Sequence, residues 1–352
     1  MMNLDDLSRF ADLDPQHMLG EIDALPAQLE HAWALGSTLP VPNFSGLRAV
    51  VIAGMGGSAI GADLLAAYAA PLCPVPVFVH RNYGLPAWAR GPETLVITSS
   101  HSGNTEETLS AFEAARAASC SLLVVSTGGK LAAQAQAENL PLWSFEHHGQ
   151  PRAAVGYSFG LLLAAFVRLG LLPDQHQAVQ EAVQTMQAQQ AHLRADVPVV
   201  HNPAKRMAGQ FFGRWVAVFG ADILEPVARR WKGQLSEVAK SWGQFESLPE
   251  ANHNTLAGLL NPEDALMHTF ALFLRAASYH PRNRKRIDLT RQTMMLAGLN
   301  TDFVDAIGEG RLAQQWSALH FGDYTAYYLA MAYGVDPTPV DSIEGFKAQM
   351  KA

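Results

Sequence analysis

The sequence predicts an α/β fold that is built from doubly wound parallel sheets and divided into two domains. Its 352 residues exceed the usual size of one domain and allow two sizeable cores. From Leu47 onward, short apolar segments rich in Val and Ile alternate with helical segments, and a similar series begins at Trp215. This alternation is typical of parallel strands that are joined by crossover helices.

The first alternating series is expected to form the sheet of the first domain. Its strands are short and nearly continuously apolar, as expected of strands that are buried on both faces. We expect strands at 49–53, 75–79, 94–98, 121–125 and 141–144, and helices at 58–69, 105–117 and 130–137. Residues 15–36 have apolar side chains at helical spacing and are expected to form an N-terminal helical arm. Pro151 is expected to begin the apolar helix that closes the domain.

The second series is expected to follow a solvated connecting helix at 175–195, a stretch rich in Gln and Ala. We expect a strand at 215–220, a long helix at about 222–246, a strand at 266–273, a helix at 284–298, a strand at 301–306 and helices within 309–333. The two series together predict an N-terminal arm at 1–40, a first domain at 41–172, a connecting segment at 173–200 and a second domain at 201–352.

Composition and charge limit the possible classes of function. Hydrophobic residues make up 49% of the chain and charged residues 16%, so we expect part of the surface to be buried in an oligomer. The net charge of −7 argues against nucleic acid as a partner. The two cysteines, Cys73 and Cys120, are too few for a disulfide scaffold or a cysteine metal site, and they fit a reducing, cytoplasmic location.

Two stretches bear on whether the chain carries a targeting or membrane segment. Residues 1–14 contain four acidic side chains and no apolar core, which is not the pattern of a signal peptide. Residues 155–172 are apolar but include Arg168, and Pro173 and Asp174 follow them. We interpret this second stretch as a buried helix and expect no association with a membrane.

Two strand–loop–helix junctions carry the strongest functional signal. Val50–Ala53 leads into a loop of Gly and Ser at 54–58, and Leu95–Thr98 leads into a loop of Ser, Gly and Thr at 99–105. Such loops lie at the carboxyl ends of parallel strands, where ligands bind in open α/β sheets. Small residues allow close approach of the backbone, hydroxyl groups donate, and helix N-termini favour anions. The two loops therefore predict a phosphate cradle.

The residues of these loops allow two other interpretations. Ser102, Thr105, Glu106 and Glu107 could form a plain helix cap without any ligand. Gly54-x-Gly56-x-x-Ala59 also fits a dinucleotide-binding fingerprint, which requires an acidic residue about 20 positions later for the ribose. Arg81 follows the next expected strand, and no acid lies between Asp63 and Glu93, so the fingerprint is weak.

The same loops resemble the sugar isomerase (SIS) domain, through Gly54–Gly61 and Ser100–Thr108. Further signatures are Arg230–Lys240, Leu248–Asn254 with its Asn252-His253-Asn254 triplet, and Asp336–Val340 with Ile343 and Lys347. Over about residues 15–350, the chain is similar to the bifunctional phosphoglucose/phosphomannose isomerase family of archaea and bacteria. This resemblance implies two SIS-type doubly wound parallel-sheet domains, each in three α/β/α layers.

The resemblance also implies a role for individual residues. Those that match phosphate and sugar contacts of the family are Gly56, Gly57, Ser58, Ser100, Ser102 and Thr105. Glu237 matches the base that moves a proton between C1 and C2, and Arg152 matches the arginine near the enediolate. His253 and Lys347 match residues that act in ring opening. The family supplies this histidine from the neighbouring subunit of a homodimer, and it needs no metal or redox cofactor.

Some residues, when they are taken singly, do not indicate a catalytic or ligand-binding role. Glu237 alone has the pattern of a helix-surface residue with Lys240 as its partner. His101 stands where the family commonly has an aromatic residue such as Tyr. His147 and His148 are expected to be exposed loop residues rather than metal ligands.

Two functions remain open from the sequence. The first is an enzyme that interconverts glucose 6-phosphate and mannose 6-phosphate with fructose 6-phosphate. The second is a regulator that binds sugar phosphates without catalysis. A DNA-binding regulator would carry a basic segment before the SIS unit, but Arg9 is the only Arg or Lys among the first 40 residues. The full set of Glu237, His253 and Lys347 favours the enzyme.

Overall fold

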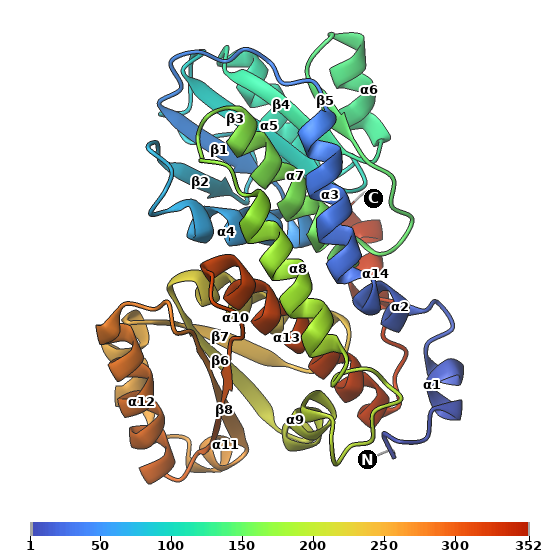
Figure 1. Ribbon diagram of the computed structural model, residues 1–352, viewed down its shortest axis with the longest axis vertical. Helices are drawn as coiled ribbons and strands as arrows, with labels where there is room; N and C mark the ends of the chain where they lie inside the picture. Colours follow the sequence, from blue (N-terminus) through green and yellow to red (C-terminus); the bar gives the residue numbers. More distant parts are fainter. Residues whose placement is uncertain (1–2, 351–352) are drawn as a thin grey trace. The chain divides into compact units, whose positions relative to one another are not determined.

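The computed structural model describes residues 3–350 and contains two compact units (Figure 1). The first-sheet unit consists of residues 24–186 and 308–315. The second-sheet unit consists of the chain up to Asp23, residues 187–307 and the chain from Trp316 onward. The boundaries predicted from the sequence follow chain order, whereas both of these units are discontinuous in the chain.

The first-sheet unit contains five parallel strands in the order β2-β1-β3-β4-β5. They are β1 (Ala49–Ala53), β2 (Val77–His80), β3 (Thr94–Ser100), β4 (Ser121–Ser126) and β5 (Leu142–Ser144). All of the strands expected in the first series are present, with ends that differ by at most two residues. The chain winds in opposite directions from β1 and β3, which are paired neighbours with Ala53 opposite Thr98. The switch point of the doubly wound sheet therefore lies between these two strands.

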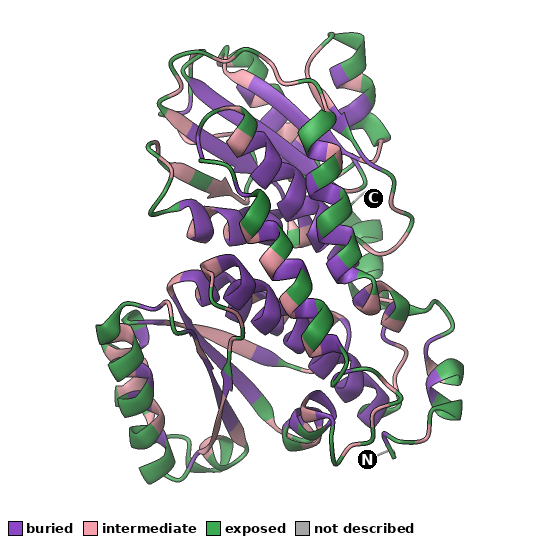
Figure 2. Ribbon diagram, viewed as in Figure 1, coloured by how far each residue is buried: buried purple, intermediate pink, exposed green. Residues whose placement is uncertain are grey.

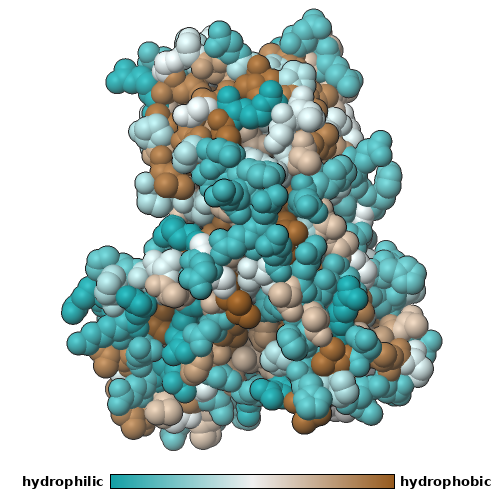
Figure 3. All heavy atoms as spheres, viewed as in Figure 1, coloured by the Kyte–Doolittle hydropathy of each residue, from teal (hydrophilic) through white to brown (hydrophobic). Residues whose placement is uncertain are grey.

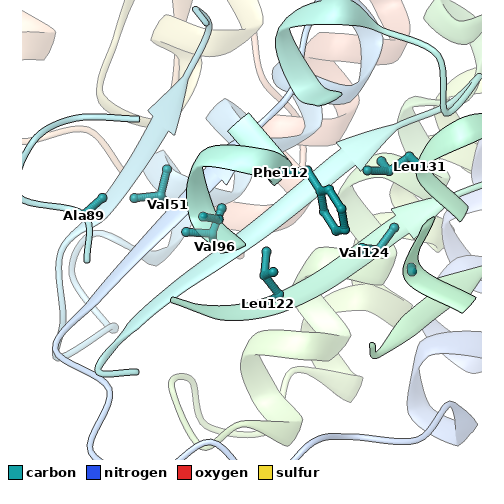
Figure 4. Close-up of a cluster of buried hydrophobic side chains, with 9 residues drawn as sticks. Val51, Ala89, Val96, Phe112, Leu122, Val124 and Leu131 are labelled. Carbon is teal, nitrogen blue, oxygen red and sulfur yellow. The ribbon is translucent and has the colours of Figure 1, made fainter. Parts of the chain in front are cut away.

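Helices cover both faces of this first sheet. The helices of the unit are α3 (Leu25–Thr38), α4 (Gly56–Ala69), α5 (Glu106–Ala117), α6 (Gly129–Ala137) and α7 (Val155–Arg168), with most of α8 (His176–Gln190). Phe112 of α5 and Leu131 of α6 pack on Val51, Val96 and Val124 of the sheet (Figure 4). Because right-handed crossovers place α4 on the opposite face, the unit has three layers, and the predicted fold class is confirmed.

Helix α7 lies between α3 and α4 and is almost wholly buried (Figure 2). Glycines permit its close approach on both sides, because a Cβ on Gly61 would lie 2.6 Å from the Cβ of Ser158 and one on Gly160 would lie 2.7 Å from that of Ala32. The apolar stretch at 155–172 is thus a core helix of the unit, as predicted. No helix among the described residues is long and apolar enough to cross a membrane.

The second-sheet unit contains four parallel strands in the order β7-β6-β8-β9. They are β6 (Trp215–Ala221), β7 (Gly243–Leu248), β8 (Thr269–Arg275) and β9 (Asn300–Asp305). Its α-helices are α1 (Ser8–Leu13), α2 (Met18–Asp23), α9 (Pro203–Phe211), α10 (Glu225–Glu237), α11 (Glu263–Met267), α12 (Pro281–Leu296), most of α13 (Arg311–Tyr333) and α14 (Asp341–Met350). The switch point of this sheet lies between β6 and β8.

The expected long helix at 222–246 is wrong. The short 3₁₀ helix η2 (Asp222–Leu224) precedes α10, which ends at Glu237, and the chain then turns into strand β7. Lys240 takes a left-handed backbone conformation, with φ of 54°, that ends the helical path. The side chains of β7 between its ends are only half-buried, because β7 is an edge strand, and so it lacks the apolar pattern of the other strands.

Two smaller expectations are also corrected. The helical arm at 15–36 is divided into α2 and α3, and Pro26 occupies the first turn of α3. The connecting helix α8 is not simply solvated, because one side is buried through Val179, Ala182 and Met186. These residues recur at helical spacing, so a buried stripe was present within the Gln-rich and Ala-rich sequence.

Candidate active site

The two loops of the predicted phosphate cradle meet at the switch point of the first sheet. Helix α4 begins at Gly56, directly after β1, and α5 begins at Glu106, directly after the loop that follows β3. Gly56 has a positive φ of 50°, which favours glycine at this bend. The N-termini of both helices thus lie at the carboxyl edge of adjacent strands, where their amide groups favour an anion.

The loop after β3 is held in shape by its own hydroxyl groups. The Oγ atoms of Ser100 and Thr105 are 2.9 Å apart, and the Gly103 amide donates to Ser100 Oγ at 3.1 Å. Gly103 has a φ of 64°, and a Cβ there would lie 1.8 Å from the carbonyl oxygen of Gly128. The loop is therefore packed tightly against the loop that follows β4, and a side chain at position 103 would force the two apart.

The plain capping interpretation of this loop is not supported. Ser102 Oγ accepts a hydrogen bond from the amide of Asn104 at 3.2 Å, and Thr105 is engaged with Ser100. Although Thr105 occupies the N-cap position, its side chain makes no capping hydrogen bond to α5. The first-turn amide groups of α5 are consequently left without the partner that a capping box would provide.

The segment that carries Arg152 packs against the start of α4. Arg152 lies in the short 3₁₀ helix η1 (Pro151–Ala153), and its side chain is 4% exposed. A Cβ on Gly57 would lie 2.3 Å from the carbonyl oxygen of Pro151, so only glycine allows this approach. Ser58 Oγ in turn accepts from the amide of His101 at 3.2 Å. The first-sheet unit thus brings the cradle residues and Arg152 to one edge of the sheet.

The dinucleotide interpretation gains no support from the region after β2. Arg81 stands at the end of this strand, where the fingerprint requires an acidic residue. Its guanidinium group pairs with the carboxylate of Asp63 on α4 and donates to the carbonyl oxygen of Ala59 at 3.1 Å. The Arg81 side chain therefore stabilises the position of α4.

Glu237 is the last residue of α10 in the second-sheet unit, and its side chain is half-buried. A carboxylate is unfavourable at a helix C-terminus, which bears the negative end of the helix dipole, so stability alone does not explain an acid at this position. Lys240 Nζ donates to the backbone carbonyl oxygen of Glu237 at 2.6 Å and so closes the end of the helix.

A buried ion pair fixes α10 against α13. Arg230 donates to both carboxylate oxygens of Asp323, at 3.0 and 2.7 Å, and both side chains are almost fully buried. Gln234 donates to the same carboxylate at 3.0 Å, and the Trp231 indole donates to the carbonyl oxygen of Ala318 at 3.0 Å. These contacts fix the helix one to two turns before Glu237 and so orient its C-terminal end.

His253 and Lys347 lie on separate parts of the second-sheet unit, and both are exposed. The backbone of His253 follows the short 3₁₀ helix η3 (Glu250–Asn252), where the side-chain amide Nδ2 of Asn252 donates to Thr290 Oγ1 of α12 at 2.6 Å. Lys347 lies on α14, a helix with no buried residue. The sequence-predicted residues are therefore divided between the two units, with Glu237, His253 and Lys347 in the second-sheet unit.

The expectation for His147 was wrong in one respect. His148 is exposed as predicted, but His147 is half-buried, and its Nδ1 lies 3.0 Å from Nε2 of His101. Sequence reasoning missed this contact because the two residues are 46 positions apart in the chain. No group of three or more His, Cys, Asp or Glu residues in the described part of the chain could hold a metal ion.

The paired parallel sheets and the cradle at a switch point define a protein of the SIS fold. A solved structure of a glucose-6-phosphate isomerase like protein from Thermus thermophilus shares this fold, with a TM-score of 0.65 and 20% identity over 97% of this chain and 99% of that one. Residues 200–350 match the bacterial phospho-glucose isomerase C-terminal SIS domain.

Sequence comparison narrows this class to one family. The chain is 37% identical to a bifunctional phosphoglucose/phosphomannose isomerase of Caldicellulosiruptor bescii, over 95% of this chain and 98% of the relative. It is 30% identical to a protein of the same name from Aquifex aeolicus, over 86% of this chain and 91% of the relative. The chain belongs to the bifunctional phosphoglucose/phosphomannose isomerase family, a family of sugar-phosphate isomerases.

Proposed function

We propose that this chain interconverts glucose 6-phosphate and mannose 6-phosphate with fructose 6-phosphate through a cis-enediolate. The observation that carries the proposal is the uncapped pair of helix N-termini at the β1–β3 switch point, in a chain that belongs to this family. A dianionic phosphate matches such a site, because amide and hydroxyl donors converge there beside the positive ends of two helix dipoles.

The cradle residues would bind the phosphate through two kinds of donor, backbone amides and side-chain hydroxyls. Gly56 and Gly57 supply amide groups at the start of α4, and the open space at the Cβ position of Gly56 lets the phosphate approach the backbone. Ser58, Ser100, Ser102 and Thr105 supply hydroxyl groups that can donate to phosphate oxygens. Binding through the remote phosphate leaves C1 and C2 of the sugar free to react elsewhere in the site.

In this proposal, Glu237 performs the proton transfer and Arg152 stabilises the intermediate. The carboxylate of Glu237 takes the proton from C2 of the open-chain aldose and returns it to C1, while the hydroxyl proton of O2 passes to O1. The aldehyde carbon C1 thereby becomes a hydroxymethyl group, and C2 becomes the ketone. Negative charge develops on the oxygen of the enediolate during this step. The buried guanidinium group of Arg152 would stabilise that charge, because burial shields the interaction from water.

His253 and Lys347 are proposed to open the sugar ring before isomerisation. Ring opening requires proton transfer at the ring oxygen and the anomeric hydroxyl, and both residues can exchange protons. The exposed position of His253 suits the family arrangement in which this histidine enters the site of a neighbouring subunit.

Exposed hydrophobic side chains also favour an oligomer. Trp242 and Leu260 are 77% and 78% exposed. Figure 3 shows hydrophobic residues among hydrophilic ones on one face of the molecule. We propose a cytoplasmic homodimer that acts in carbohydrate metabolism.

The cradle is tested by removing two of its hydroxyl groups. The Ser102→Ala, Thr105→Ala double variant is expected to raise KM for both aldose phosphates at least about tenfold, because a hydrogen bond to a charged group contributes about 1.5–3 kcal/mol. Steady-state kinetics provide the measurement. Ser144→Ala removes an exposed hydroxyl at the end of β5 and should leave KM unchanged. An unaltered KM in the double variant would remove the phosphate cradle from the proposal.

The shared site is tested by mixing two inactive variants. Glu237→Gln and His253→Ala should each be nearly inactive alone. In a heterodimer, one of the two sites combines the intact Glu237 of one chain with the intact His253 of the other. Random exchange of subunits should therefore restore about one quarter of the wild-type activity. Activity that never exceeds the sum of the two separate variants would show that His253 does not act across a dimer.

The alternative function is a regulator that binds sugar phosphates without catalysis. Both functions predict binding, so binding alone does not separate them. A coupled assay of fructose 6-phosphate formation from each aldose phosphate does, since only the enzyme forms the ketose. Binding without turnover by the wild-type protein would favour the regulator.

A further inference from the structure

Five ring-bearing residues of the first-sheet unit gather beside the cradle. They come from four parts of the chain: His31 (α3), His101 (after β3), Phe145 and His147 (after β5) and Tyr157 (α7). Phe145 stacks on Tyr157 with ring centroids 4.9 Å apart, and His31 Nδ1 lies 2.9 Å from the hydroxyl of Tyr157. Within this group, the imidazoles of His101 and His147 contact each other.

The geometry of this pair is that of a hydrogen bond. The two ring nitrogens are 3.0 Å apart and the ring centroids 5.2 Å, so each nitrogen lies close to the line between the ring centres. Two metal ligands would instead direct their lone pairs to a third point. In a hydrogen bond, one imidazole donates and the other accepts, so the accepting ring is neutral.

The pair joins two segments that both belong to the proposed site. His101 lies between Ser100 and Ser102 in the cradle. His147 lies in the irregular segment 145–150, which leads into η1 and Arg152. The His101–His147 contact is therefore a direct side-chain link between the loop that binds phosphate and the segment that positions the arginine.

The loop that carries His101 and the segment that carries His147 are held in place by different kinds of contact. The backbone of His101 is fixed independently, since its amide donates to Ser58 Oγ and its carbonyl oxygen accepts from the amide and hydroxyl of Thr127 at 3.2 and 2.6 Å. The irregular segment before Arg152 is joined to its surroundings by side-chain contacts, through the stacking of Phe145 on Tyr157 and the contact of His147 with His101. Loss of the link should therefore displace the segment of Arg152 more than the cradle.

We propose that His101 and His147 are positioning residues that hold the Arg152 segment against the phosphate loop. The inference rests on the proposed isomerase function, in which Arg152 stabilises the enediolate. His101 and His147 need not touch the reacting atoms. They act by keeping the buried guanidinium group of Arg152 at a fixed position relative to the phosphate, which is bound through other residues.

The kinetic signature of such a link is a loss in kcat with little change in KM. His147→Phe keeps an aromatic ring but removes the hydrogen bond, and it should lower kcat about tenfold or more, because displacements near 1 Å at a catalytic group can cost about 10²-fold. KM should stay within about twofold, since the cradle keeps its own hydrogen bonds. His101→Phe should have the same effect, and the double variant should be no worse than either single one.

Conservative variants separate the hydrogen bond from simple packing. His147→Asn places an amide near the position of Nδ1, and His101→Gln places one near Nε2, so each should recover much of the lost kcat. His148→Asn changes the exposed neighbour and should match the wild type. Additive losses in the double variant, a change confined to KM, or no rescue by the amides would each overturn the proposal.

Hydrogen–deuterium exchange provides a readout that does not depend on catalysis. His147→Phe should speed amide exchange in residues 145–153 and leave 100–105 unchanged. If the wild type proves inactive as an isomerase, the proposed function fails, but this exchange result still decides whether the link exists. Unchanged exchange in residues 145–153 would show that the link does not hold the segment.

Discussion

Replacing Glu237 by glutamine is expected to lower kcat by about 10²–10⁴-fold with both glucose 6-phosphate and mannose 6-phosphate. The variant keeps the size of the side chain and its hydrogen-bonding capacity but removes the base. The proposed phosphate contacts lie in the first-sheet unit and are untouched, so binding should survive. A non-reactive sugar-acid phosphate should still raise the thermal midpoint of the variant.

Glu225→Gln is the matched control for this variant. Glu225 lies on the same helix α10, at its first residue rather than its last. The control should isomerise both substrates at close to the wild-type kcat. Near wild-type turnover by Glu237→Gln would refute the assignment of the base, and an equal loss in both variants would point to damage of the helix instead.

Breaking the buried ion pair between α10 and α13 should have the largest effect on stability. Arg230→Met leaves the carboxylate of Asp323 buried beside the side-chain amide of Gln234, without the guanidinium group that balances its charge. Removal of one member of such a pair costs about 3–5 kcal/mol, because the other charge is left uncompensated in the interior. The free energy of unfolding in urea should fall by that amount.

Two further variants identify the cause of that loss. Arg230→Met with Asp323→Leu removes both charges and should recover much of the stability, since a well-packed apolar pair can replace a buried ion pair. Arg48→Met breaks an ion pair to Glu93 whose side chains are 79% and 58% exposed, and it should cost no more than about 1 kcal/mol. A cost this small for Arg230→Met would show that the buried pair does not hold α10.

The sequence predicts the first sheet well because its strands are marked locally. β1, β3 and β4 are apolar runs rich in Val, Ile or Leu that lead into Gly, Ser or Thr, and such runs have few alternatives to a buried parallel strand. Strand β7 was missed because its polar residues Gln244 and Glu246 look like a continuation of α10. Its assignment depends on pairing with β6, a contact that no local pattern contains.

The site could be predicted only in part. The cradle loops are recognisable because Gly, Ser and Thr follow two strands, and topology then brings them together. The pairing of Arg230 with Asp323 and of His101 with His147 joins residues 93 and 46 positions apart. Such pairs depend on how helices and loops pack in three dimensions, so neither spacing nor composition could have indicated them.

The most direct test of the central proposal is isomerisation of glucose 6-phosphate in deuterium oxide, followed by NMR. If Glu237 transfers the proton through an enediolate, part of it exchanges with solvent, so fructose 6-phosphate should form with deuterium at C1. The Glu237→Gln variant should form hardly any labelled product. A wild-type protein that binds the sugar phosphates but shows neither isomerisation nor deuterium incorporation would contradict the proposal.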